Sequence, residues 1–138
     1  MTVAASLVAE TVNAGKVDIP LKNGIYVAEG AKCPKPGTRP IDLPVDSINY
    51  TGDGLGFNDG NNHGHLFDNV HNKGNIYYIN GKTITGVGGH NMGTFHLTIE
   101  IKTDSSFSIT KAEGVTFFAD KPPKKETVYR YCGNPYKY

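Results

Sequence analysis

The chain has no tryptophan, only two methionines and two cysteines, and no excess of either charge. Its formal net charge is +1 and 20% of its residues are charged, so no strongly basic face is predicted and nucleic acid is not an expected partner. No apolar run reaches the length that a membrane span requires. No CxxC pair is present, and two cysteines alone cannot form a cysteine-rich zinc site.

Motifs of the common catalytic sites are also missing. The sequence contains no G-x-S-x-G elbow, no P-loop and no H-E-x-x-H pair. We therefore predict no catalytic residue and no cofactor.

Glycine and aromatic residues are what the sequence has in abundance. The 138 residues include 17 glycines, 8 tyrosines and 6 phenylalanines, a composition typical of short strands joined by tight turns. The length predicts a single domain over residues 1–138, with residues 133–138 as a loose tail.

The N-terminal segment is not an intact signal peptide, because it has no basic region and Glu10 interrupts its apolar character. It is compatible with the start of a mature exported chain. Residues 1–15 are expected to form an arm or a short helix over roughly Ala4 to Asn13, ended by Gly15.

Period-two alternation predicts strands along most of the chain. The clearest row is Phe95, Leu97, Ile99 and Ile101, which alternates with polar residues and continues after an Asp104–Ser105 turn. Further strands are expected at Ile25 to Ala28, around Leu55 to Phe57, in "GVTFFAD" and in "TVYRYC", whereas the proline-rich stretch from Cys33 to Pro44 reads as a surface loop. About eight strands predict an all-β antiparallel barrel, with a β-sandwich as the alternative.

Asn80–Gly81 is the strongest local turn signal. Both residues tolerate positive φ, so the sequence predicts a type I′ hairpin that pairs Ile79 with Lys82 and Tyr77 with Ile84.

Cys33 and Cys132 are either buried free thiols or the two ends of one bridge between an early segment and the last strand. We favour the bridge, because exported β domains commonly use such a staple. An exported location, periplasmic or secreted, follows from this interpretation.

Three further features resemble small exported bacterial β-barrels of lipocalin-like type. They are the "GIYVAEG…C" opening, the Y-x-G-x-G step at Tyr50, Gly52 and Gly54, and the closing "YRYC". The resemblance implies a barrel whose mouth holds a small apolar ligand.

Three of the five histidines, His63, His65 and His71, lie within nine positions of the chain. His63 and His65 in an extended segment would project to the same side, as two imidazoles that share a metal must. The alternative is a polar loop rich in glycine and asparagine, which we favour, so no metal site is predicted.

His96 and Glu100 share one face of a predicted strand and could form an acid–base pair. Their face opposes the apolar row, so a solvated outer surface is the favoured interpretation.

The predicted ligand site is the apolar row together with aromatic residues of the neighbouring strands. These residues present more apolar surface than one pair of strands can bury. They must therefore face a second layer or a barrel interior. We predict a small exported binding protein for an apolar molecule and favour this interpretation over an enzyme. An interaction module (an inhibitor or adhesin with an unidentified protein partner) and a barrel enzyme of cyclase or isomerase type are the alternatives. The predicted ligand contacts are Tyr77, Phe95, Leu97, Ile99, Phe107 and Phe117.

Overall fold

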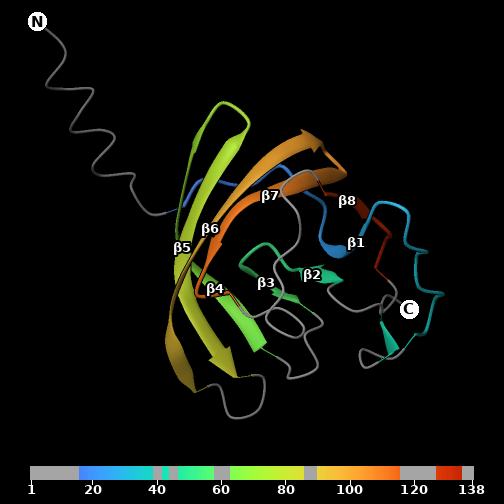
Figure 1. The fold of residues 1–138 in the computed structure, drawn as a ribbon, viewed down its shortest axis with the longest axis horizontal. Coiled ribbons are helices and arrows are strands. Elements are labelled where there is room, and N and C mark those ends of the chain that lie inside the picture. Colours follow the sequence, from blue (N-terminus) through green and yellow to red (C-terminus); the bar gives the residue numbers. More distant parts are fainter. Residues whose placement is uncertain are drawn as a thin grey trace, which may run out of the picture.

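The computed structural model describes residues 16–38, 42–43, 47–57, 63–85, 90–115 and 127–134. They form a closed antiparallel barrel in which each strand pairs with its neighbours in the chain (Figure 1). The predicted barrel is thus confirmed, and the sandwich is not what forms. The strands are β1 (Gly24–Ala28), β2 (Ile48–Tyr50), β3 (Gly54–Phe57), β4 (His63–Lys73), β5 (Ile76–Thr85), β6 (Asn91–Thr103), β7 (Ser106–Glu113) and β8 (Val128–Tyr131).

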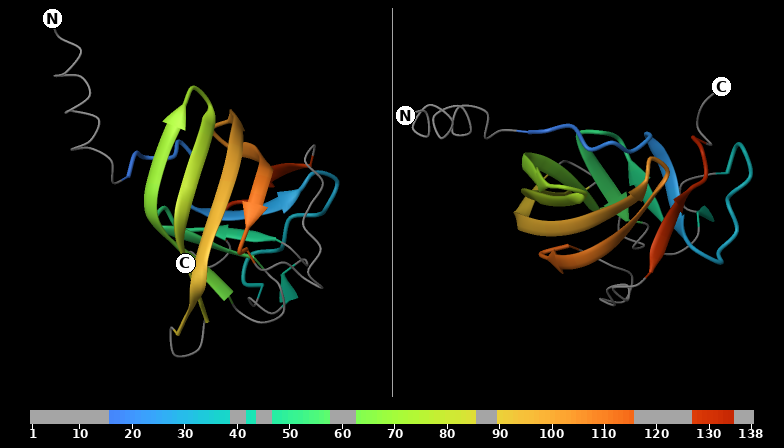
Figure 2. Two further views of the ribbon diagram at one scale, coloured as in Figure 1. Left: turned by 60° about the vertical axis from the view of Figure 1, so that its left-hand side comes forward. Right: turned by 90° about the horizontal axis from the view of Figure 1, so that it is seen from above.

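Strand length divides the barrel into two sides. β4, β5 and β6 have 11, 10 and 13 residues, whereas β1, β2, β3 and β8 have five or fewer. In Figure 2 the long strands curve around one side, and the short strands complete the other. β1 closes the barrel by pairing with β8, where Tyr26 lies opposite Tyr131.

Several predicted elements are confirmed, and others lie outside the described residues. The strands β1, β3 and β8 and the turn at Asp104–Ser105 occur where the sequence indicated them. The predicted N-terminal helix and all but the first two residues of "GVTFFAD" fall outside the described part of the chain.

The prediction of a hairpin turn at Asn80–Gly81 is wrong. Both residues lie inside β5, and the two-residue turn is at Gly74–Asn75, where Gly74 has a φ of +61°. Ile79 therefore pairs with Val70 and Leu97 rather than with Lys82.

The reason for this difference lies in the packing around Gly81. It is buried between Phe67 of β4 and Phe95 of β6, its partners on the two neighbouring strands. A Cβ atom there would overlap the carbonyl oxygen of Leu66 and lie 2.7 Å from the ring of Phe95. The glycine thus permits a close approach of β4 at a bulge after Phe67, where the register shifts.

The polar loop expected around His63, His65 and His71 is also wrong, because this segment forms β4. From His65 to Val70 the buried residues are His65, Phe67 and Val70, interrupted by the bulge. The bulge breaks the simple alternation, and four asparagine, histidine and lysine residues follow it closely, which conceals the strand in the sequence.

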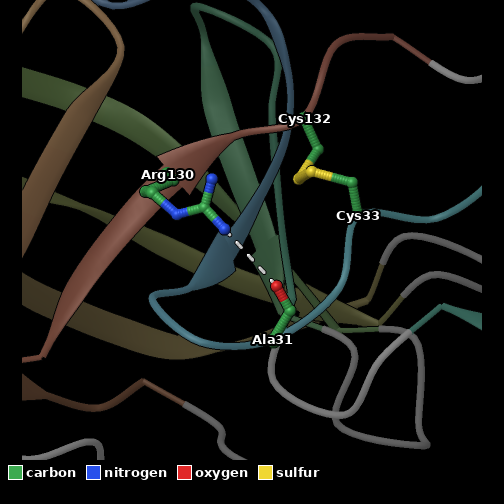
Figure 3. The surroundings of a disulfide bond; sticks show 4 residues. All are labelled: Ala31, Cys33, Arg130 and Cys132. Atoms are coloured by element: carbon green, nitrogen blue, oxygen red, sulfur yellow. Dashed lines mark hydrogen bonds between the residues drawn. A yellow bond between two sulfur atoms is a disulfide. The ribbon is translucent and has the colours of Figure 1, made fainter.

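The disulfide between Cys33 and Cys132 is present, with a Cα–Cα distance of 5.4 Å. Figure 3 shows that it joins the segment after β1 to the end of β8, and the Arg130 guanidinium donates a hydrogen bond to the Ala31 carbonyl on the same segment (3.5 Å). This segment covers the outer face of β1, so that β1 is buried on both faces. The outer cluster consists of Ile25, Val27 and Leu43, with Ala31 and Cys132 packed against it.

Ser47, just before β2, has a buried hydroxyl without a hydrogen-bond partner in the described structure; the residue is 3% exposed. An unsatisfied buried hydroxyl destabilises a fold by about 1 kcal/mol or more. We expect Ser47→Ala to raise the free energy of unfolding by about 1 kcal/mol in chemical denaturation. A Ser47→Ala variant less stable than the parent would show that this hydroxyl is bonded in solution.

Candidate functional site

Five of the six predicted ligand contacts lie in the barrel core, and Phe117 lies outside the described residues. Leu97 has no exposed surface, Ile99 and Phe107 are 1% exposed, Phe95 is 3% exposed and Tyr77 is 8% exposed. Water therefore reaches almost none of their surface, from outside or from an internal space. In this structure they contact other side chains of the core, and their role as ligand contacts stays a prediction.

Aromatic rings fill much of the interior. Tyr26 contacts Phe107 edge-to-face at a centroid distance of 5.2 Å, and Phe107 stacks on Tyr129 at 5.6 Å. On the other side, the His65 imidazole lies edge-on between Phe57 and Phe95, at 5.7 and 5.2 Å. Such edge-to-face pairs are favourable geometries for aromatic packing, so the interior is a specific core around these residues.

The histidines of β4 do not converge where the structure describes them. His65 is 1% exposed inside the barrel, with its Nδ1 atom 3.3 Å from the Leu55 carbonyl oxygen. His71 is exposed and stacks on Tyr78 at 5.1 Å. The side chain of His63 is outside the described part. Within the described residues no group of three histidine, cysteine, aspartate or glutamate side chains could hold a metal ion.

His96 and Glu100 lie on the face of β6 opposite the core row, as the favoured interpretation expected. The His96 ring bonds Asn80 Oδ1 through Nδ1 (2.7 Å) and Thr98 Oγ1 through Nε2 (3.1 Å). Glu100 instead pairs with Lys102, at 3.2 Å. The two side chains thus have separate partners on the outer surface, and no acid–base pair between them forms in this arrangement.

Residues 16–23, which we call the strap, run from β4 to the start of β1 (Figure 1). The Val17 amide donates to the Val70 carbonyl at 3.0 Å. At the other end of the strap, the Tyr26 hydroxyl donates to the Lys22 carbonyl (2.7 Å) and the Tyr131 hydroxyl donates to the Asn23 carbonyl (2.9 Å). Two barrel tyrosines therefore fix one end of the strap and β4 fixes the other.

The strap packs on the barrel through alternate residues. Ile19 is 9% exposed and belongs to the core cluster, and Val17 and Leu21 pack against the same cluster. Asp18 and Pro20 between them are exposed. The alternation of Val17, Ile19 and Leu21 is a period-two signal in the sequence that could have identified this buried face.

A cleft of about 180 Å³ lies between the strap and the barrel, and we call it the strap cleft. A cavity of about 150 Å³ holds a molecule of the size of benzene, so the strap cleft suits a small ligand. Its lining joins the strap to β2, β4 and the turn between β2 and β3. The lining residues are Lys16, Val17, Asp18, Ile19, Leu21, Asn23, Tyr50, Gly52, Asp53, Phe67 and Val70.

Tyr50 is the most unusual residue of the strap cleft. It is 4% exposed, and no hydrogen bond of its hydroxyl is formed with the described residues, unlike the hydroxyls of Tyr26 and Tyr131. Burial raises the pKa of Tyr50 to about 12, and the negative charges of Asp18 and Asp53 add to the shift. The phenol is thus held neutral, close to two carboxylates and available to a ligand.

The buried tyrosines predict a loss of stability in alkali. Burial also raises the pKa of Tyr26, further than that of Tyr50, with Tyr131 as a second cause. Above the ordinary tyrosine pKa of about 10 the unfolded chain loses these protons while the folded chain keeps them, so stability falls as the pH rises from about 10 towards 12.

Each tyrosine contributes a slope of about 1.4 kcal/mol per pH unit in that range. We expect the free energy of unfolding, measured by rapid urea denaturation, to be constant from pH 7 to 9 and to decrease steeply above pH 10. Tyr50→Phe should make the decrease shallower. An unchanged slope in this variant would contradict the raised pKa of Tyr50.

A second, more open cleft of about 310 Å³ lies beside the turn between β6 and β7. Its lining includes Glu29, Arg130 and the hydroxyls of the turn. Several of these groups already form hydrogen bonds within the protein: Thr103 and Ser106 share a hydrogen bond of 2.7 Å, and Ser105 donates to Asp104. This cleft therefore offers fewer free groups than the strap cleft.

No protein-family model, curated protein or solved structure matches the chain. The lipocalin-like resemblance thus stays a prediction. In the described residues no helix has the length and apolarity needed to cross a membrane.

Proposed function

We propose that the protein is a small exported, lipocalin-like binding protein that holds its ligand in the strap cleft rather than in the interior of the barrel. The observation that carries the proposal is Tyr50, a residue only 4% exposed that lines this cleft and whose hydroxyl has no hydrogen-bond partner among the described residues. A phenol hydroxyl can donate and accept a hydrogen bond, so a ligand in the cleft would bond it in place of water.

The composition of the strap cleft also supports ligand binding. Its floor is apolar, with the Phe67 ring tilted against Tyr50 at 6.3 Å, and a few polar groups stand at its rim. Ligand sites of proteins commonly combine an apolar surface with a few polar groups that orient the ligand. The disulfide supports an oxidising, exported location, because such bridges are rare in reducing compartments.

Filling the strap cleft with a larger side chain tests this proposal. Val17 is half-buried in the lining, so Val17→Trp should occupy the space of the ligand. We expect benzyl alcohol, a probe of suitable size, to bind the parent saturably in an NMR titration, with a dissociation constant of about 1–10 mM. Val17→Trp should weaken this binding at least about tenfold.

Val128→Trp is the matched control, because Val128 is a half-buried valine in the lining of the second cleft. This variant should bind the probe as the parent does. The proposal would be contradicted if Val17→Trp bound benzyl alcohol as tightly as the parent does. It would also be contradicted if Val128→Trp abolished this binding instead.

The interaction-module alternative stays a prediction. Leu66 and Met92 are large apolar side chains on the surface, 47% and 55% exposed, but single exposed apolar residues are normal in soluble proteins.

A further inference from the structure

The charges around the strap cleft favour a cation. Asp18 and Asp53 are exposed carboxylates of the lining, and Lys16 is the only cationic side chain among the described residues that line the cleft. Neither carboxylate has an ion-pair partner in the described structure. The described part of the lining thus carries one net negative charge, with two carboxylates that accept no side-chain hydrogen bond from the described residues.

The Tyr50 hydroxyl is an independent sign of a polar ligand group, because a phenol can donate or accept a hydrogen bond. Tyr50 is only 4% exposed, and its hydroxyl oxygen has no hydrogen-bond partner in the described structure. A primary ammonium group has three N–H donors and no acceptor. The two carboxylates and the phenolic oxygen can accept hydrogen bonds from all three donors. A carboxylate ligand has no such donors to offer them.

The aromatic rings give a second reason for a cation. Tyr50 and Phe67 both line the strap cleft, and a cation close to an aromatic face is attracted by the negative face of the ring. Val17, Ile19 and Val70 provide apolar contact for the remainder of the ligand. The pattern of an acidic rim and an apolar, aromatic floor matches an amphipathic amine.

We infer that the strap cleft selects a small primary amine, whose ammonium group is held by Asp18, Asp53 and the Tyr50 hydroxyl and whose apolar body lies against Phe67. This inference rests on the proposed function. The inference also makes the proposed function more specific, because the ligand becomes a cationic amine instead of an apolar molecule of unspecified chemistry.

Three probes with the same ring and different head groups test the inference: benzylamine, benzyl alcohol and benzoate. Their binding to the full chain at neutral pH and low salt is measured by NMR titration of backbone amides. Benzylamine should bind about tenfold tighter than benzyl alcohol, and benzoate should bind weakest. The preference for benzylamine should decrease with added salt, because salt screens exposed charges.

Variants of the rim identify the groups responsible. Asp18→Asn and Asp53→Asn should each weaken benzylamine binding about threefold to tenfold while leaving benzyl alcohol nearly unchanged. Tyr50→Phe should weaken it about threefold. Asp68→Asn is the matched control: it removes the same charge from the outer face of β4, where Asp68 lies 3.8 Å from Lys82, and it should leave benzylamine binding unchanged.

The outcomes separate the two proposals. If benzyl alcohol or benzoate binds the strap cleft as tightly as benzylamine does, the inference is overturned while the proposed function stands. If benzylamine binding is equally sensitive to Asp68→Asn and to Asp18→Asn, general attraction to an acidic surface explains it and the inference is overturned. If none of the three probes binds, both proposals fail.

Discussion

Reduction of the disulfide between Cys33 and Cys132 is expected to lower the free energy of unfolding by about 4–5 kcal/mol in the chain-entropy model. The two residues are 99 positions apart, so the bridge restricts a large loop of the unfolded chain. Reduction also releases the segment that covers Ile25 and Val27 on the outer face of β1. For a chain of 138 residues this loss corresponds to a decrease of about 14–17 °C in the melting temperature.

Urea denaturation with and without a reductant measures this effect. A Cys33→Ala, Cys132→Ala double variant is the control: it should match the reduced parent and should not respond to the reductant. Unreduced parent, denatured in urea, should show no free thiol. Two titratable thiols in that sample, or an unchanged denaturation midpoint after reduction, would contradict the structural role of the bridge.

Gly81→Ala is expected to destabilise the barrel by about 3 kcal/mol or more. The added methyl group would overlap the Leu66 carbonyl of β4, which is backbone and cannot rotate away, and would press on the Phe95 ring of β6. Because Gly81 is paired with both neighbouring strands, a shift on either side disturbs the longest part of the sheet.

Gly64→Ala provides a matched control for this measurement. Gly64 also lies within a strand, and a Cβ atom there would meet only the Ile84 side chain, at an ordinary contact distance of 3.5 Å. We expect Gly64→Ala to change the free energy of unfolding by less than about 1 kcal/mol. Equal effects of the two substitutions, in the same denaturation experiment, would show that close approach at Gly81 is not what the fold requires.

The barrel was predictable because most buried rows alternate in the sequence. Phe95, Leu97 and Ile99 show the period of a strand with one buried face, and the structure buries them as predicted. The bridge from Cys33 to Cys132 followed from two cysteines placed near the first and last predicted strands. Both features are local patterns, or depend only on the order of the strands.

The turn and the fourth strand were not predictable from local patterns. Asn80–Gly81 has strong turn propensity, but Gly81 is required between Phe67 and Phe95, a contact made by three different strands. In β4 the bulge after Phe67 changes which residues face inward, so His65 enters the core although its neighbours in the sequence are polar. Tertiary packing overrode local preference in both cases.

The strap cleft was the hardest feature to predict from the sequence. Its residues come from the strap, from the turn between β2 and β3 and from the middle of β4, and no spacing in the chain joins them. Tyr50 was noted only as part of a glycine-containing step. The burial of its side chain and its proximity to Asp18 and Asp53 depend on how the strap crosses the barrel.

The location of the bound ligand tests the central claim most directly. A titration of the full chain with benzylamine, followed by backbone amide chemical shifts, reports which residues the probe approaches. We predict saturable shifts at the strap (Val17 to Leu21), at Asp53 and at Phe67, with Leu97 and Ile99 unaffected. Shifts centred on Leu97, Ile99 and Phe107 would instead place the ligand inside the barrel and contradict the account.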